Sequence, residues 1–190
     1  MVKVSFIVEG DVEKILIEAL VPWFKERGIT KVGPVINVRG GGNLCPGNID
    51  LYIEQAKVWN PAKILILTDL ECDSCVTQTK TRVGNCKECV VIVARKAIEA
   101  WFLADTLLLE NLLKGKIVPY EAPEKTELMP FDVLKQLFLD KTGRGISKKM
   151  LARRSVQYFS PERAASHPDC PSAAYFIRKI DEIGRIPMES

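Results

Sequence analysis

The sequence predicts an α/β protein: a Rossmann-like parallel sheet of about four strands, with helices on both faces and a helical C-terminal annex. Two observations support this fold class. Over residues 1–105, short apolar runs rich in β-branched residues alternate with amphipathic stretches, which is typical of parallel strands joined by right-handed crossovers. From residue 106 onward the helical patterns continue and the strand patterns stop. We therefore expect an α/β domain over residues 1–105 and a helical annex over residues 106–190 that packs on it.

The α/β half contains strand and helix patterns in regular order. Buried strands are expected at the short apolar runs, which are residues 2–8, 32–38, 63–68 and 90–94. The first helix is expected at residues 11–27, because Val12, Leu16 and Phe24 share one stripe and Gly28 follows as a stop. Further helices are expected at residues 49–59, 96–104, 107–113, 131–139, 148–158 and 172–183, separated by proline and glycine in the second half.

Composition narrows the class of protein. The chain has 190 residues, 47% of them hydrophobic, and a net charge of +3, which is ordinary for a globular protein. Its apolar runs are short and broken by charge, so no membrane span is expected. The N-terminus enters a strand at once, without the pattern of a signal or transit peptide. We expect a cytoplasmic protein.

Acidic residues follow two of the expected strands. Glu9 comes directly after the first strand, and Asp69 and Glu71 come after the third. Alternating residues point to the same side of an extended chain, so Asp69 and Glu71 are expected to converge. Glu13 is expected on the first turn of the helix that follows Glu9, near the strand edge. Carboxyl ends of parallel strands form the ligand-binding edge of open α/β sheets.

Carboxylates gathered at such an edge suit Mg²⁺ or Mn²⁺, and those metals suit phosphate chemistry. The alternative is that these acids are ordinary surface residues at strand ends, with Glu13 stabilising the start of a helix. The coincidence of Glu9 with Asp69 and Glu71 on one sheet favours the metal site.

Four cysteines form two Cys-x-x-Cys pairs within an insert over residues 72–89. They are Cys72, Cys75, Cys86 and Cys89. Four thiolates in this spacing are typical of a tetrahedral structural Zn²⁺ site, and the polar residues 76–85 between the pairs are expected to form a loop that needs such a staple. The alternatives are reduced thiols near the strand edge or a redox pair.

A basic stretch covers residues 141–161, which include no acidic residue. Two interpretations are open: contacts to nucleic-acid phosphates, or a solvated helix face with basic residues near its C-terminal end. The cations that would contact phosphates are Lys148, Lys149, Arg153 and Arg154. The glycine run at residues 40–42 is expected to be a flexible connection at the ligand edge, with a backbone phosphate cradle as the alternative.

These residues together resemble the TOPRIM superfamily, the nucleotidyl-transfer and phosphodiester-hydrolysis module of topoisomerases, bacterial-type primases and OLD-type nucleases. More narrowly, the chain is similar to small uncharacterised TOPRIM-like proteins found among phage-defence and mobile-element genes. The matching signatures run nearly end to end: Val8-Glu9-Gly10-x-x-Glu13, Gly40 to Gly42, Asp69-x-Glu71, the segment Ile98 to Asp105, and Cys170-Pro171-Ser172.

The resemblance implies a role for each acid. Glu9 would act as general acid/base, Asp69 and Glu71 would bind Mg²⁺, and Glu13 would be a further acid. Glu99 would reach into the acidic site as an extra ligand or its organiser; the alternative is an exposed position on its helix. One departure is that the second acid of the family's Asp-x-Asp pair is Glu71, which lengthens one ligand arm.

The sequence-based hypothesis is therefore a Mg²⁺- or Mn²⁺-dependent nuclease or nucleotidyl-transfer module with a structural Zn²⁺. Its partners would be DNA or RNA, with a protein encoded nearby as a further candidate. The rival hypothesis is a non-catalytic, zinc-stapled protein that binds nucleic acid or another protein.

Overall fold

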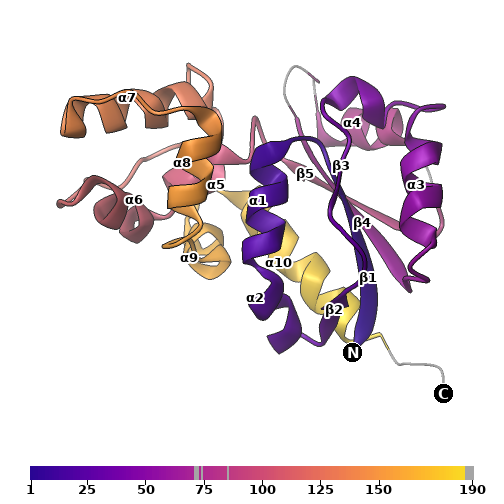
Figure 1. Cartoon of the computed structure of the whole chain (residues 1–190). Coiled ribbons are helices and arrows are strands. Elements are labelled where there is room, and N and C mark those ends of the chain that lie inside the picture. The colour runs from indigo at the N-terminus through magenta and orange to yellow at the C-terminus, as the bar shows by residue number, and fades with distance from the viewer. Residues whose placement is uncertain (71–72, 74, 85, 187–190) are drawn as a thin grey trace.

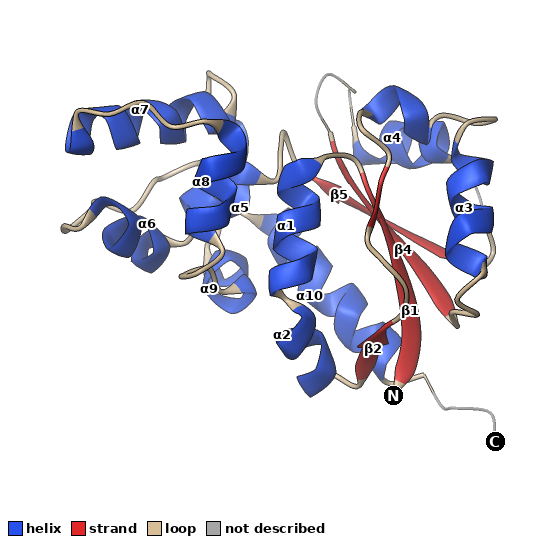
Figure 2. Ribbon diagram, in the orientation of Figure 1, coloured by secondary structure: helices blue, strands red, loops and turns tan. Residues whose placement is uncertain are grey.

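The computed structural model describes residues 1–70, 73, 75–84 and 86–186. Within them, five strands form one parallel sheet (Figures 1 and 2), and their bounds are β1 (Val2–Val8), β2 (Ile29–Lys31), β3 (Ile36–Asn37), β4 (Lys63–Asp69) and β5 (Cys89–Ala94). The strand order is β2-β1-β4-β5, and every paired strand is parallel to its neighbour. The predicted α/β fold class is confirmed.

The edge beside β1 is built from two short strands. β2 pairs with the beginning of β1, and β3 pairs with its end. The single strand predicted over residues 32–38 is therefore wrong in its extent. Gly33 adopts a left-handed φ of 67°, and Pro34 has no N–H to donate to a ladder, so the chain leaves the sheet between the two pairings.

Helices cover both faces of the sheet (Figure 2), as predicted. On one face lie α1 (Asp11–Ala19), α2 (Val21–Glu26) and α10 (Pro171–Gly184), and on the other lie α3 (Ile49–Lys57) and α4 (Val76–Val83). Successive residues of β1 serve the two layers: Phe6 packs among the first group and Ile7 among the second. The rings of Phe6 and Phe24 lie 4.9 Å apart, which fixes α2 against the sheet.

Two predicted elements differ from the structure. The helix expected over residues 11–27 breaks at Leu20, because Pro22 in the first turn of α2 lacks the N–H that would continue α1. The loop expected over residues 76–85 is instead the helix α4, whose Thr79 and Val83 are buried. Gly84 follows this helix with a φ of 88°.

The remaining helices gather beside α1 (Figure 1). They are α5 (Glu99–Ala104), α6 (Thr106–Leu113), α7 (Pro130–Thr142), α8 (Lys148–Ser155) and α9 (Pro161–Ser166), with short 3-10 turns η1 (Gly41–Leu44) and η2 (Pro123–Lys125). One hydrophobic cluster contains Phe6 of the sheet and Phe138 of α7. The division of the chain into domains at residue 105 stays a prediction. Among the described residues, no helix is long and apolar enough to cross a membrane.

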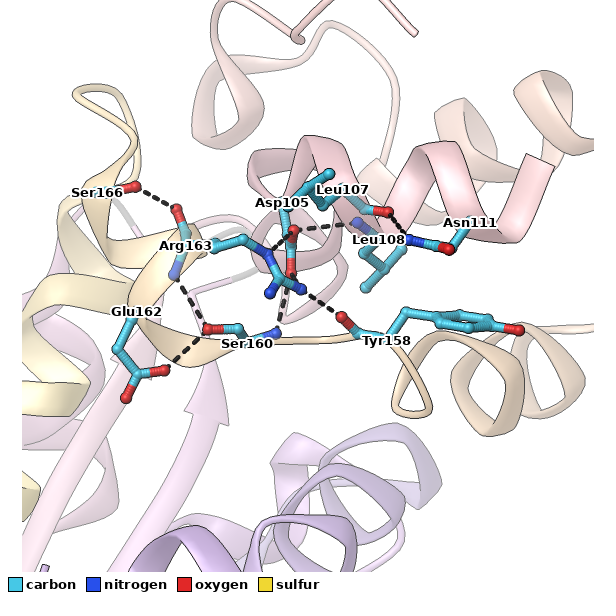
Figure 3. A network of polar contacts seen from close by, with 9 residues as sticks. All are labelled: Asp105, Leu107, Leu108, Asn111, Tyr158, Ser160, Glu162, Arg163 and Ser166. Atoms are coloured by element: carbon cyan, nitrogen blue, oxygen red, sulfur yellow. Dashed lines mark hydrogen bonds and ion pairs between the residues drawn. The ribbon is translucent and has the colours of Figure 1, made fainter. Parts of the chain in front are cut away.

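An ion pair between the buried Asp105 and the partly exposed Arg163 ties α9 to the turn between α5 and α6 (Figure 3). The Asp105 carboxylate accepts hydrogen bonds from Arg163 Nε at 2.7 Å and Arg163 Nη2 at 2.9 Å. It also accepts from the backbone N–H of Leu108 at 3.1 Å and of Ser160 at 2.9 Å. Four donors to one fully buried carboxylate make Asp105 a structural anchor of the annex.

Candidate active site at the carboxyl edge of the sheet

The acids predicted from strand ends meet at the carboxyl edge of β1 and β4. Glu9 follows β1 directly, and Asp69 is the last residue of β4. Val8 is in register with Leu67, and the Glu9 backbone N–H donates to the Leu67 carbonyl at 3.2 Å. The parallel pairing therefore places Glu9 beside the end of β4.

The Glu9 carboxylate is held by groups of β4. Its Oε2 accepts hydrogen bonds from the Thr68 hydroxyl at 2.5 Å and from the Asp69 backbone N–H at 3.1 Å. Its Oε1 faces Gly41, where a Cβ atom would lie only 2.9 Å from that oxygen. A side chain at position 41 would displace the carboxylate, so the glycine run serves as a close backbone approach to Glu9.

Asp69 and Glu99 are placed by the beginning of α5. Asp69 Oδ1 accepts a hydrogen bond from the Ile98 backbone N–H at 2.9 Å. The next residue, Glu99, is only 1% exposed, and its Oε1 lies 3.1 Å from Lys148 Nζ of α8. Within the described part of the chain, Glu99 Oε2 has no hydrogen-bond partner.

Glu13 completes this group from the first turn of α1, where it is 3% exposed. We call Glu9, Glu13, Asp69 and Glu99 the carboxylate cluster. The four carboxyl groups lie close enough to interact electrostatically: Glu9, Glu13 and Glu99 each raise the pKa of Asp69 by repelling its ionised form.

Burial and mutual repulsion disfavour the ionised form of two members. Burial raises the pKa of Glu13 from an ordinary 4.5 to about 7, against a backbone hydrogen bond that lowers it, and repulsion from Glu99 and Glu9 adds to the rise. Burial, followed by repulsion from Glu13 and Glu99, holds the pKa of Asp69 well above its ordinary value. Full ionisation of the cluster would therefore place more negative charge there than its surroundings neutralise.

Lys148 is the cation of the annex that faces the cluster. Burial lowers the pKa of Lys148, but attraction to Glu99, Asp69 and Glu13 outweighs it, so the pKa lies above its ordinary value and the ammonium stays charged. The sequence placed Lys148 among candidate phosphate contacts, whereas the structure pairs it with an acid.

The other residues of the basic stretch lie in different surroundings. Lys149 Nζ lies 3.2 Å from Asp11 Oδ2 at the start of α1. Arg153 is exposed, and the Arg154 guanidinium lies 5.6 Å from the centre of the Phe138 ring. Only part of the predicted basic stretch thus lies at the carboxylate cluster, and Arg153 and Arg154 stay predicted phosphate contacts.

Two predicted site residues, Glu71 and Cys72, lie outside the described residues. Of the other cysteines in the insert, Cys75 is exposed, and Cys86 and Cys89 are half-buried. Cys86 Sγ lies 3.3 Å from Glu88 Oε2. Burial raises the pKa of the Cys89 thiol, and a hydrogen bond with Cys86 raises it further, so this pair is close together. In the described ranges, no three His, Cys, Asp or Glu residues are arranged as a preformed metal site.

The sequence did not single out Thr68, and it gave Gly41 and Lys148 other roles. Thr68 is the one hydroxyl residue in the apolar run that ends at Asp69. A polar residue at the end of an otherwise apolar strand could have indicated that its side chain contacts the site. The pairing of Lys148 with Glu99 joins residues 49 positions apart, for which the sequence contains no local signal.

No family model matches this chain, and no curated protein matches it. Among solved structures, it is similar to the C-terminal region of the Burkholderia pseudomallei OLD protein, at 16% sequence identity over 94% of this chain and 98% of that one, with a TM-score of 0.46. It is also similar to the C-terminal region of the Xanthomonas campestris pv. campestris OLD protein, at 19% identity over 96% of this chain and 93% of that one, with a TM-score of 0.36.

Proposed function

We propose that the protein performs Mg²⁺- or Mn²⁺-dependent phosphodiester chemistry on nucleic acid, as a TOPRIM-type nuclease or nucleotidyl-transfer module. The observation that carries this proposal is the carboxylate cluster. Four buried acids, one directly after β1 and the others on α1, β4 and α5, gather at the edge of the sheet where α/β proteins bind ligands. Such a concentration of carboxylates is costly in a structural role and useful in a metal-dependent one.

The donor set of the cluster fits a hard divalent cation. Carboxylate oxygens are the ligands that Mg²⁺ and Mn²⁺ prefer, and Glu99 Oε2 is a buried oxygen without a hydrogen-bond partner in the described chain. Glu9 and Asp69 would hold the metal, together with Glu71 as the sequence predicts, and Glu99 is the further donor. A bound metal would polarise a phosphoryl oxygen and neutralise charge that develops in the transition state.

Proton transfer is assigned to Glu13 in this proposal. A carboxyl group with a pKa of about 7 exchanges its proton readily near neutral pH, as a general acid or base requires. The resemblance assigned that role to Glu9, but Glu9 Oε2 already accepts two hydrogen bonds and is thereby arranged as an acceptor. Lys148 would offset negative charge beside the reacting phosphate, from its position 3.1 Å from Glu99.

The structural Zn²⁺ is a separate proposal for Cys72, Cys75, Cys86 and Cys89. It is supported by the nearness of Cys86, which follows α4, to Cys89, the first residue of β5. Metal analysis of the untagged protein in reductant is expected to find about one zinc per chain. Clearly less than one equivalent, with melting unchanged by chelator, would refute the site.

The proposed activity is tested with purified protein, Mg²⁺ or Mn²⁺, and DNA and RNA substrates. The wild type is expected to bind Mn²⁺ in calorimetry and to cut nucleic acid, and Asp69→Asn is expected to lose both. Asp50→Asn, which alters an exposed acid of α3, is the matched control and is expected to retain both. Metal binding that does not depend on Asp69, together with no cutting of any substrate, would overturn the proposal in favour of a non-catalytic binding protein.

A further inference from the structure

A cavity lies next to the carboxylate cluster, at the carboxyl ends of β4 and β5. Its volume is ≈ 410 Å³, and its walls include Leu70, Thr77, Val93, Arg95, Ser172 and Tyr175. Leu70 is the residue after Asp69, and Arg95 is the residue after Ala94, which is in register with Asp69. The cavity therefore opens beside the proposed metal-binding edge.

Tyr175 of α10 is the aromatic residue in the wall of this cavity. It lines the cavity and also a second one of ≈ 270 Å³, which runs along β5 past Val90 and Val91. α4 and α10 cover opposite faces of the sheet (Figure 2) and meet around the edge strand β5, where Lys80 Nζ lies 2.9 Å from the Tyr175 hydroxyl. The two cavities thus form a strip from the end of β4 along the edge of the sheet.

Cations surround the ring. Lys80 Nζ lies 4.5 Å from its centre, the Arg178 guanidinium 5.1 Å and Lys179 Nζ 5.6 Å. Arg95 adds a fourth positive charge from the cavity wall. Two acids offset part of this charge: Glu182, which lies 2.5 Å from Lys179 Nζ and 3.9 Å from Arg178 Nε, and Glu124, 3.7 Å from Arg95 Nε. The strip keeps a positive excess, unlike the carboxylate cluster beside it.

We propose that this strip, the Tyr175 surface, binds a single-stranded polynucleotide, with one base packed in the ≈ 410 Å³ cavity against Tyr175 and the backbone phosphates along Arg95 and Lys80. An aromatic ring among cations is the combination that binds single strands, because every unpaired base has a face that can stack. Bases within a duplex are stacked on one another and cannot enter such a cavity. This inference deepens the proposed function and rests on it, since it names the form of the substrate.

The inference is tested by binding in EDTA, where metal-dependent cutting is absent. Fluorescence anisotropy would compare a labelled 15-mer of thymidine, a 15-mer of uridine and a 15-base-pair duplex. Tyr175→Ala is expected to weaken binding of single strands about 5- to 150-fold, the range for loss of one stacked base. Tyr175→Phe keeps the ring and is expected to stay within about 3-fold of the wild type on the same reasoning. The DNA and RNA strands show which sugar is preferred.

Tyr158 provides the matched control, because it is an exposed tyrosine of the annex whose ring points away from the Asp105 network (Figure 3). Tyr158→Ala is expected to bind like the wild type. Arg95→Gln tests the charge independently of the ring, and is expected to lower the slope of log affinity against log salt by about 0.7, the value for one lost phosphate contact with a single strand.

Three results would overturn the inference: equal affinity of Tyr175→Ala and wild type, tighter binding of the duplex, or equal binding of a polyglutamate peptide with the same dependence on Tyr175. The last would assign the surface to an acidic protein segment. A different result would contradict the proposed function: the protein binds single strands in a Tyr175-dependent manner but cuts no nucleic acid with Mg²⁺ or Mn²⁺.

Discussion

Neutralising Glu13 is expected to stabilise the metal-free protein. Burial raises the pKa of Glu13 to about 7 from an ordinary 4.5, so the folded protein holds this proton more tightly than the unfolded chain does. The folded protein therefore loses stability as the pH rises from about 4.5 to about 7, and the full loss is present above pH 7. At 1.36 kcal/mol per pKa unit, the loss is about 3 kcal/mol.

Glu13→Gln removes this penalty while keeping the shape of the protonated side chain. At pH 8 the variant is expected to unfold with a free energy about 3 kcal/mol higher than that of the wild type, and at pH 4 the two are expected to be equal. Relief of the repulsion between Glu13 and Asp69 acts in the same direction. Urea denaturation in EDTA, followed by circular dichroism at both pH values, measures the difference.

Glu18→Gln is the matched control, because Glu18 is an exposed glutamate of the same helix, 3.9 Å from Lys14. It is expected to leave the free energy of unfolding nearly unchanged at either pH. If Glu13→Gln were no more stable than the wild type at pH 8, the buried and repelled state of Glu13 would be refuted. If the advantage were the same at pH 4, its cause would be packing and not charge.

Two further predictions concern positions with clear geometric roles. Gly41→Ala is expected to push the Glu9 carboxylate aside and so to lower Mn²⁺ affinity, measured by calorimetry, and the rate of cutting at least 10-fold. It is expected to cost less than about 1 kcal/mol in denaturation, because the atom displaced is the end of a side chain. Gly42→Ala, with open space around the added methyl group, is the control and is expected to change neither Mn²⁺ affinity, cutting nor stability. Asp105→Ala is expected to cost about 1–3 kcal/mol in urea denaturation, since it leaves the buried Leu108 N–H without its acceptor, and a loss below about 0.5 kcal/mol would contradict the anchoring role.

Local patterns in the sequence predicted the strands of the sheet and most of the helices that pack on it. Apolar runs such as 2–8 and 63–68 are short and flanked by charge, and the packing of Phe6 and Ile7 on opposite faces of the sheet follows directly from strand geometry. The predicted ends of helices and strands were wrong where a proline or glycine interrupted the regular backbone. Pro22 divided a helix whose apolar stripe continued, and Gly33 with Pro34 divided a strand. In α4, buried Thr79 and Val83 stabilise a helix that its polar composition did not predict.

The sequence by itself determined that acids stand at the ends of two strands, because Glu9 and Asp69 directly follow apolar runs typical of buried strands. That these two strands are neighbours in the sheet was decided by the tertiary structure. Tertiary structure decided what surrounds them. Gly41, Lys148 and Tyr175 reach this edge from segments 32 to 166 positions away from Glu9, since the sheet and the annex fold over one shared core. Charge balance, pKa values and cavities depend on distances in space, and those distances are set by how the helices pack on the sheet.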